Sequence, residues 1–170
     1  QMDIQENERK LQTLMNNLPG MAYRCYNTSD WIMDFASEGC VDLLGYSAEE
    51  LLSSKTVQYS DFVHPEDLPR IWEQVQEGVL NDRPFRMEYR IFTKQGREKW
   101  VWEQGRGVFN ENGELENIQG FITSISERKE VQQKLEHKEE KLRKSFVQLA
   151  ETTSRVLGVR DPYTQQHEQR

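Results

Sequence analysis

The sequence predicts an α+β fold: a five-stranded antiparallel sheet covered by short helices and one longer helix, with a flanking helix at each end. Two observations lead to this prediction. Five strand-like runs occur as a pair, then a helical stretch, then a group of three, and the connections within each group carry turn-forming residues. The chain of 170 residues has room for one such domain plus extensions.

The first expected element is a helix over residues 3–18. Leu11, Leu14 and Leu18 recur at spacings of three and four, which places them on one helical face, and Pro19-Gly20 ends the helix. This apolar stripe needs a partner surface.

A hairpin and two short helices come next. Residues 21–26 and 31–36 have the pattern of strands separated by a cluster of turn residues. Two helical turns follow, separated by Gly45 and restarted at Ser47, which can cap a helix together with Glu50.

A longer helix is expected from Pro65 to Leu80. Proline is favoured at the first helical position, and Glu66 and Asp67 would complement the helix dipole from the first turn. The apolar side of this helix consists of Leu68, Ile71, Trp72, Val75 and Val79.

Three strands over residues 85–93, 99–109 and 116–126 complete the sheet. Both of its faces carry bulky apolar groups, because Trp100 and Trp102 point to the opposite side from Val101 and Glu103. We expect one face to cover the interior and the other to pack beneath the N-terminal helix. Charged residues that face the interior would need partners, because an unpaired buried charge is costly; the candidates are Glu88, Arg90 and Glu103.

An ordered series of short motifs runs from about residue 14 to residue 129. They are Asn17-Leu18-Pro19-Gly20, Leu44-Gly45-Tyr46-Ser47-Ala48-Glu49-Glu50-Leu51, His64-Pro65-Glu66-Asp67, Glu88-Tyr89-Arg90-Ile91, Gly96 with Trp100, and Gly120 with Glu127-Arg128. In this order they resemble the PAS sensor domain, with Ser124-Ile125-Ser126-Glu127-Arg128 as its closing PAC-type motif. The family usually has Asp where this chain has Ser124.

The resemblance implies a regulatory domain that is not itself an enzyme. Its last strand would pass movement of the sheet to a signalling helix, and the relay residues would be Ser124, Ser126, Glu127 and Arg128. A ligand, where one binds, would lie between sheet and helices, in a pocket lined by Trp72, Val75, Met87, Tyr89, Ile91, Val101 and Glu103. The alternative is that these side chains form a solid core.

Two cofactors known in this family are not expected. Flavin photosensors of the family use a Cys on the helix before the long one, whereas no Cys follows Cys40 in this chain. Haem binding often uses a His on the long helix, and residues 65–80 contain none. A small metabolite and no ligand at all stay as alternatives.

The C-terminal charged segment has a heptad pattern. Steps of four and three residues alternate through Val131, Leu135, Lys138, Leu142, Ser145, Leu149, Thr152 and Val156. We expect a weak parallel coiled coil whose apolar seam residues, Val131, Leu135, Leu142, Leu149 and Val156, form a homodimer. A single helix lying on a domain is the alternative.

The last residues suggest an output domain in the same chain. Asp161-Pro162-Tyr163-Thr164 followed by His167 and Arg170 resembles the opening of HD-GYP domains, the cyclic di-GMP phosphodiesterases. His167-Glu168-Gln169-Arg170 also resembles the phosphoacceptor segment of histidine kinases, the alternative output. Pro162 argues against the kinase, because it would cost a continuous dimerisation helix about 3 kcal/mol.

These predictions divide the chain into an N-terminal flanking helix (1–18), a PAS domain (19–126), a signalling helix (127–157) and the truncated start of an output domain (158–170). The net charge of −7 disfavours nucleic acid or direct membrane contact. The three His are far apart, so no metal site is expected. The lack of a long apolar run or leader pattern predicts a cytoplasmic location. A ligand-free interaction module is the alternative to a sensor.

Overall fold

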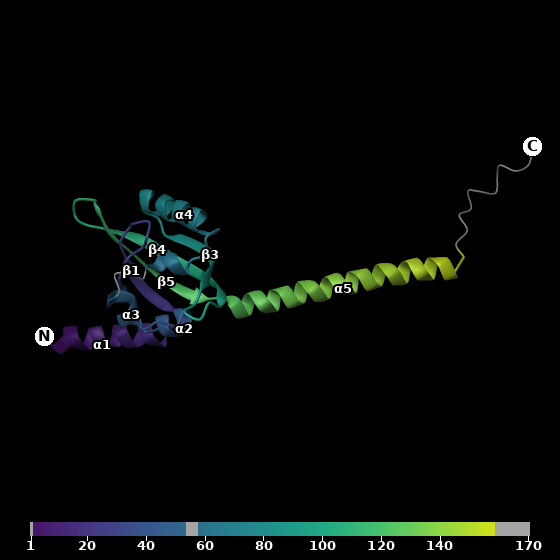
Figure 1. Ribbon diagram of the computed structural model, residues 1–170, viewed down its shortest axis with the longest axis horizontal. Helices are drawn as coiled ribbons and strands as arrows, with labels where there is room; N and C mark the ends of the chain where they lie inside the picture. Colours follow the sequence, from purple (N-terminus) through teal and green to yellow (C-terminus); the bar gives the residue numbers. More distant parts are fainter. Residues whose placement is uncertain (1, 54–57, 159–170) are drawn as a thin grey trace, which may run out of the picture. The chain divides into compact units, whose positions relative to one another are not determined.

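A computed structural model describes residues 2–53 and 58–158 (Figure 1). The chain divides into two units between Glu127 and Arg128. The predicted output segment from residue 159 onward, including His167, lies outside the described residues. Within the described ranges, no helix has both the length and the apolar character needed to cross a membrane.

The first unit contains the predicted five-stranded antiparallel sheet, in the order β2-β1-β5-β4-β3. The strands are β1 (Met21–Cys25), β2 (Met33–Ala36), β3 (Phe85–Phe92), β4 (Glu98–Phe109) and β5 (Leu115–Ser124). The last strand, β5, therefore lies in the middle and joins the N-terminal hairpin to the β3–β4 hairpin. The α+β fold class is confirmed.

Short helices follow the first hairpin: α2 (Cys40–Leu44), α3 (Ala48–Ser53) and the 3-10 helix η1 (Tyr59–Phe62). The predicted capping box is present at the start of α3. The Ser47 amide donates to the Glu50 carboxylate at 2.8 Å, and the Glu50 amide donates to the Ser47 hydroxyl at 3.1 Å. Gly45 ends α2 with a φ of 82°, a left-handed conformation that favours glycine.

The longer helix, α4 (Leu68–Leu80), begins three residues later than predicted. Pro65 and Glu66 lie in a turn before it, and Pro69 occupies the first turn instead. Asp67 and Glu66 accept hydrogen bonds from the Arg90 side chain at 2.9 and 3.0 Å, so these carboxylates tie the turn to β3. The Arg90 side chain holds the pKa of Asp67 below its usual range.

The N-terminal helix, α1 (Met2–Asn17), has the predicted extent but not the expected packing. Leu11, Leu14 and Leu18 are 60%, 63% and 52% exposed, so the described part of the chain does not cover these leucines. The helix formed by residues 3–18 was expected to cover the outer sheet face, and that expectation is wrong. Helical periodicity places the leucines on one side, but it does not say what that side contacts.

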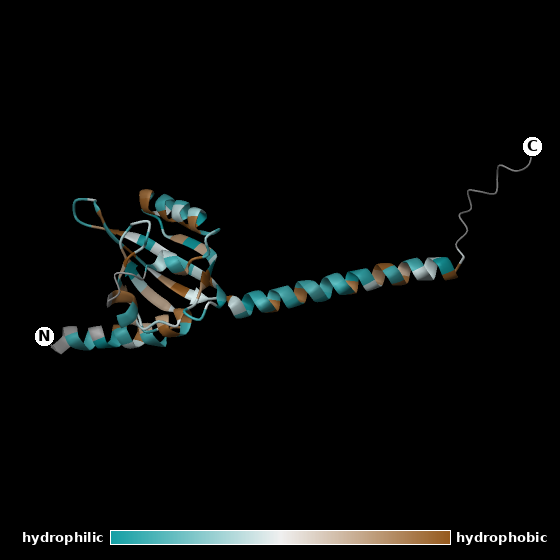
Figure 2. Ribbon diagram, in the orientation of Figure 1, coloured by the Kyte–Doolittle hydropathy of each residue, from teal (hydrophilic) through white to brown (hydrophobic). Residues whose placement is uncertain are grey.

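The C-terminal helix, α5 (Ser126–Val156), begins where β5 was expected to continue. Ser126 is its first residue, and β5 ends at Ser124. Figure 2 shows a largely hydrophilic helix with separated apolar residues. No α5 residue is buried.

A close backbone approach fixes the start of the sheet. Gly39 has an ordinary helical conformation, with φ −57° and ψ −14°, so its backbone does not require glycine. A Cβ atom at this position would instead overlap the carbonyl of Gly20. The connection between α1 and β1 can therefore lie against the start of α2 only while residue 39 has no side chain.

We predict that Gly39→Ala lowers the free energy of unfolding by about 3 kcal/mol, because backbone atoms must separate to admit the methyl group. Urea denaturation measures this. The control is Gly113→Ala, where φ is +79° and no atom lies within 4 Å of the added Cβ. It should lose only about 1 kcal/mol from backbone strain. Equal losses in the two variants would contradict the packing explanation.

Candidate functional site

A buried carboxyl group lies at the centre of the inner sheet face. Glu103 of β4 is only 5% exposed. One of its oxygens accepts a hydrogen bond from the Tyr23 hydroxyl of β1, and the other accepts one from the Tyr89 hydroxyl of β3 at 2.6 Å. The Tyr89 hydroxyl also bonds the Tyr59 hydroxyl of η1 at 2.8 Å. We call Glu103 and these three tyrosines the Glu103 cluster.

Two glycines make room for this cluster. Tyr23 pairs with Gly120 across β1 and β5, and Gly120 pairs with Gly105 across β5 and β4. An added Cβ would lie 2.6 Å from the Tyr23 hydroxyl at Gly120 and 2.8 Å from it at Gly105. The Tyr23 ring therefore lies over two glycines, Gly120 of β5 and Gly105 of β4, on its way to Glu103.

Burial dominates the electrostatics of the Glu103 cluster. It raises the pKa of the Glu103 carboxyl, and the hydrogen bonds from Tyr23 and Tyr89 oppose that shift. Burial, followed by the nearby Glu103 charge, raises the pKa of Tyr23, Tyr59 and Tyr89. The three tyrosines therefore stay protonated. Tyr23 and Tyr89 donate to the carboxyl, and Tyr59 bonds to the Tyr89 hydroxyl.

The structure places most of the predicted pocket residues together in one core. Tyr89, Ile91 and Val101 have no exposed surface, and Val75 and Met87 are buried beside them. Trp72 was predicted in the same pocket, but it is 37% exposed. Its ring lies at the surface of α4, 6.0 Å from the ring of Trp31. An apolar residue at the edge of the helical stripe can pack against a surface side chain instead of the core. Sequence spacing alone does not distinguish these two positions.

The three charged residues of these strands have different surroundings. Only Glu103 is buried, while Glu88 and Arg90 are partly exposed. Both Glu103 oxygens have tyrosine partners within the chain, so the carboxyl does not require a ligand for its hydrogen bonds. Tyr23 and Tyr59 were not predicted as site residues. Alternation could place Tyr23 inward with Met21 and Cys25, but it gave no sign that the hydroxyl reaches Glu103.

The joint between sheet and α5 is held by backbone hydrogen bonds to β4. The Ile125 amide donates to the Trp100 carbonyl at 2.9 Å, and the Trp100 amide donates to the Ser126 hydroxyl at 2.9 Å. The Ser126 amide lies 3.4 Å from the Ser124 hydroxyl. Ser124 and Ser126, two of the predicted relay residues, are thus brought together at this joint. Glu127 follows in the exposed first turn of α5, and Arg128 opens the second unit.

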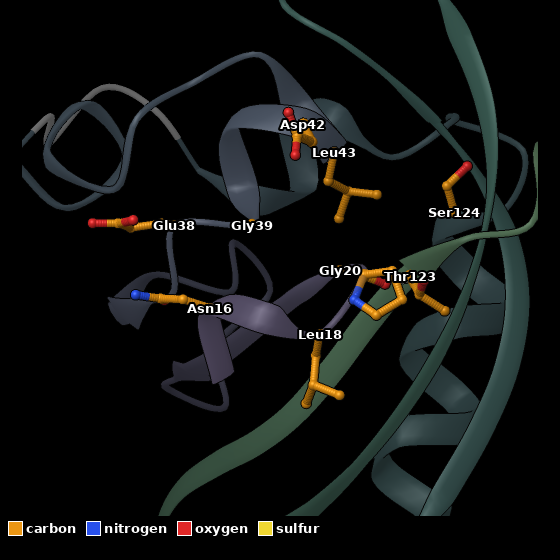
Figure 3. Close-up of a pocket in the computed structure, with 10 residues that line it drawn as sticks. Asn16, Leu18, Gly20, Glu38, Gly39, Asp42, Leu43, Thr123 and Ser124 are labelled. Carbon is orange, nitrogen blue, oxygen red and sulfur yellow. Dashed lines mark hydrogen bonds between the residues drawn. The ribbon is translucent and has the colours of Figure 1, made fainter. Parts of the chain in front are cut away.

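A cavity of about 390 Å³ lies beside this joint (Figure 3). Its lining comes from the end of α1 and its connection, from α2, and from the end of β5, and it includes Leu18, Asp42, Leu43, Thr123 and Ser124. The Thr123 hydroxyl donates to the Pro19 carbonyl, which joins β5 to the α1–β1 connection on one side of the cavity. Sequence motifs did not predict this cavity, because its walls meet only in the folded chain.

The predicted seam of α5 is exposed along its length. Val131, Leu135, Leu142, Leu149 and Val156 are 61%, 57%, 72%, 65% and 79% exposed. Phe146 is 71% exposed as well and was not assigned to the seam. In the described part of the chain, no group of three or more His, Cys, Asp or Glu side chains could hold a metal ion.

Comparisons with known proteins agree on the fold. Residues 33–122 match a protein family described as PAS fold. Over 129 residues the chain is 31% identical to the methyl sulfide methyltransferase-associated sensor of Methanosarcina acetivorans. That alignment covers 75% of this chain but only 13% of the sensor.

Solved structures at lower identity share the architecture. A sensory box histidine kinase/response regulator from Burkholderia thailandensis is 21% identical, with a TM-score of 0.62 and coverage of 79% of this chain and 98% of that one. The N-terminal domain of a diguanylate cyclase with PAS/PAC sensor from Marinobacter aquaeolei is 17% identical, with a TM-score of 0.53 and coverage of 64% and 97%.

We predict that Tyr23→Phe lowers the free energy of unfolding by about 1–3 kcal/mol, because one buried Glu103 oxygen loses its donor. Thermal or urea unfolding measures the change. Tyr26→Phe is the matched control: Tyr26 is 47% exposed and its hydroxyl contacts Asp34 at 3.4 Å. The control should change stability little. A Tyr23→Phe variant as stable as the control would argue against a dependence of Glu103 on this bond.

A second prediction concerns pH. The folded pKa of Glu103 is raised, so above about pH 4.3 the unfolded chain loses a proton that the folded chain keeps. This contribution favours the folded state less as pH rises. Glu103→Gln has no such proton. The unfolding free energy of this variant should therefore rise relative to that of the unmodified chain between pH 4 and pH 7.

Urea titrations at several pH values measure this difference. Glu111→Gln, in the exposed β4–β5 turn, is the control and should run parallel to the unmodified chain. A Glu103→Gln difference that is the same at all pH values would show that the carboxyl ionises as readily in the folded state as in the unfolded state.

Proposed function

The chain belongs to the PAS-fold family, and we propose that it is the sensory and dimerisation module of a signalling protein, passing a signal through α5 to an output domain. The observation that carries the proposal is the joint at Ser124–Ser126. The first residue of α5 is hydrogen-bonded to Trp100 of β4, so a shift of the sheet displaces the start of the helix.

Dimerisation through α5 follows from its exposed seam. The heptad spacing suits packing against an identical helix, and polar Lys138, Ser145 and Thr152 keep the seam weak. A weak seam can exist in two arrangements of similar energy. A ligand or partner then shifts the balance only to the extent that it binds one arrangement more tightly.

A small metabolite is the proposed signal, and a ligand-free interaction module is the second candidate. The second is favoured by the Glu103 cluster, whose carboxyl oxygens are both satisfied by tyrosines. Native mass spectrometry of freshly purified protein separates them. Extra mass that disappears on denaturation supports the sensor, whereas the bare chain mass favours the interaction module.

We further propose an HD-GYP type of phosphodiesterase as the output, on the strength of the Asp161-Pro162-Tyr163-Thr164 motif and His167. The encoded residues that follow Arg170 test this. A His-Asp metal-binding pair would support it, and a kinase ATP-binding domain would make the protein a histidine kinase instead.

We predict that Leu142→Glu with Leu149→Glu weakens the dimer, because each change places a charge in the seam. Sedimentation equilibrium should show a dissociation constant raised by about 100-fold or more. The control is Gln133→Glu with Ser154→Glu, which adds the same charge on the opposite side of α5. An unchanged mass distribution in the seam variant would exclude α5 as the dimer contact.

A further inference from the structure

The cavity beside the sheet–α5 joint has walls of mixed chemistry (Figure 3). Its volume of about 390 Å³ lies within the range of about 300–1,000 Å³ that is typical of small-molecule sites. Leu18, Pro19 and Leu43 give it apolar surface, and Figure 3 shows Leu43 pointing from α2 toward the connection at Gly20. The lining contains no member of the Glu103 cluster, so this cavity differs from the pocket predicted from the sequence.

Two acidic residues set the charge of the lining. Glu38 and Asp42 are exposed, and within residues 2–53 and 58–158 neither carboxylate has a hydrogen-bond or ion-pair partner. Lys99 reaches α2, but its ammonium donates to the backbone carbonyls of Asp42 and Leu43, at 2.8 and 3.2 Å. No Lys, Arg or His is among the ten lining residues. The walls of the cavity are therefore negatively charged.

The end of α1 adds to this negative potential. Asn16 of its last turn and Leu18 just beyond it both line the cavity, and the last turn contains no basic residue. The C-terminal end of an α-helix carries a partial charge of about −0.5 from its unsatisfied carbonyl groups. A helix end and two carboxylates from a different segment thus border the same space. Together they favour a positively charged ligand.

The lining also distinguishes between classes of cation. Aromatic faces typically hold a quaternary ammonium, and none of the ten lining residues is aromatic. Calcium takes at least about six oxygen ligands, whereas the described part of the chain has no group of three or more His, Cys, Asp or Glu side chains that could hold a metal ion. A primary ammonium has three N–H donors, which suit the two carboxylates and the Asn16 amide oxygen.

We propose that this cavity binds a small primary amine with a short alkyl chain, whose apolar part packs against Leu18 and Leu43. The inference rests on the proposed sensory function and names the class of metabolite that acts as the signal. Ser124 lines the cavity, and its hydroxyl lies 3.4 Å from the Ser126 amide. A bound amine therefore contacts the residues that lead into α5.

Titration of the 170-residue chain with n-butylamine, followed through the backbone amides by NMR, tests the site. We expect saturable shifts of the Gly39, Thr123 and Ser124 amides. n-Butanol has the same alkyl chain without the charge, and butyrate has the opposite charge, so both should bind at least about tenfold more weakly. Equal binding of n-butanol would overturn the proposal, because the apolar walls alone would explain it. The absence of any saturable shift with n-butylamine would overturn it as well.

A double variant tests the acidic residues directly. Glu38→Gln with Asp42→Asn should raise the dissociation constant for n-butylamine about tenfold or more. The matched control is Glu73→Gln with Glu77→Gln, which removes two exposed carboxylates, also four residues apart, from α4. It should change the constant less than about twofold, because salt screens distant charges. Equal weakening in both variants would assign the binding to overall charge and contradict the site. Urea unfolding verifies that both variants are folded.

Two further readouts separate this site from the proposed function. Shifts of the Ile125 and Ser126 amides on amine binding support a relay to α5. Amine binding that leaves these amides unmoved supports the site and counts against the relay. If a lysine of a second copy fills the cavity instead, the unmodified chain will not bind n-butylamine. The Glu38→Gln/Asp42→Asn variant will then show a raised dimer dissociation constant in sedimentation, and this inference will be wrong.

Discussion

The buried carboxyl of Glu103 is the interaction on which the interior depends. Its tyrosine partners lie on β1 and β3, and Tyr59 adds η1 through Tyr89, so one acidic group connects elements that are far apart in the sequence. A charge in such a place would be costly alone, and the hydrogen bonds from Tyr23 and Tyr89 to its two oxygens reduce that cost. Gly105 and Gly120 are part of the same arrangement, because a side chain at either position would clash with Tyr23.

The central position of β5 links this interior to the helix that follows. β5 pairs with both β1 and β4, so it lies between the strand that carries Tyr23 and the strand that carries Glu103. The chain then passes through Ile125 and Ser126, which bond to Trp100 two residues before Trp102. In the relay proposed above, the single strand β4 carries both Glu103 and the Trp100 bonds to the start of α5.

The apolar groups that remain exposed point to association. The stripe of α1 and the seam of α5 both leave leucines in solvent, and isolated chains gain by covering such surfaces. These exposed leucines suit the dimerisation module proposed above. The residues of the Glu103 cluster, in contrast, find their hydrogen-bond partners within one copy.

The sequence by itself determined the order of elements, the apolar face of β3, the capping box at Ser47, and the helical spacing of the leucines in α1 and α5. Each of these depends on residues within one or two turns or on strand alternation, so local periodicity was sufficient. The tertiary structure alone decided that α4 begins at Leu68, that Trp72 lies at the surface, and that Tyr23 reaches Glu103 from 80 residues away. It also decided that α1 leaves its leucines uncovered. The physical reason is that a side chain's face follows from its neighbours in sequence, whereas its partner follows from strand order and backbone approach, which no local pattern contains.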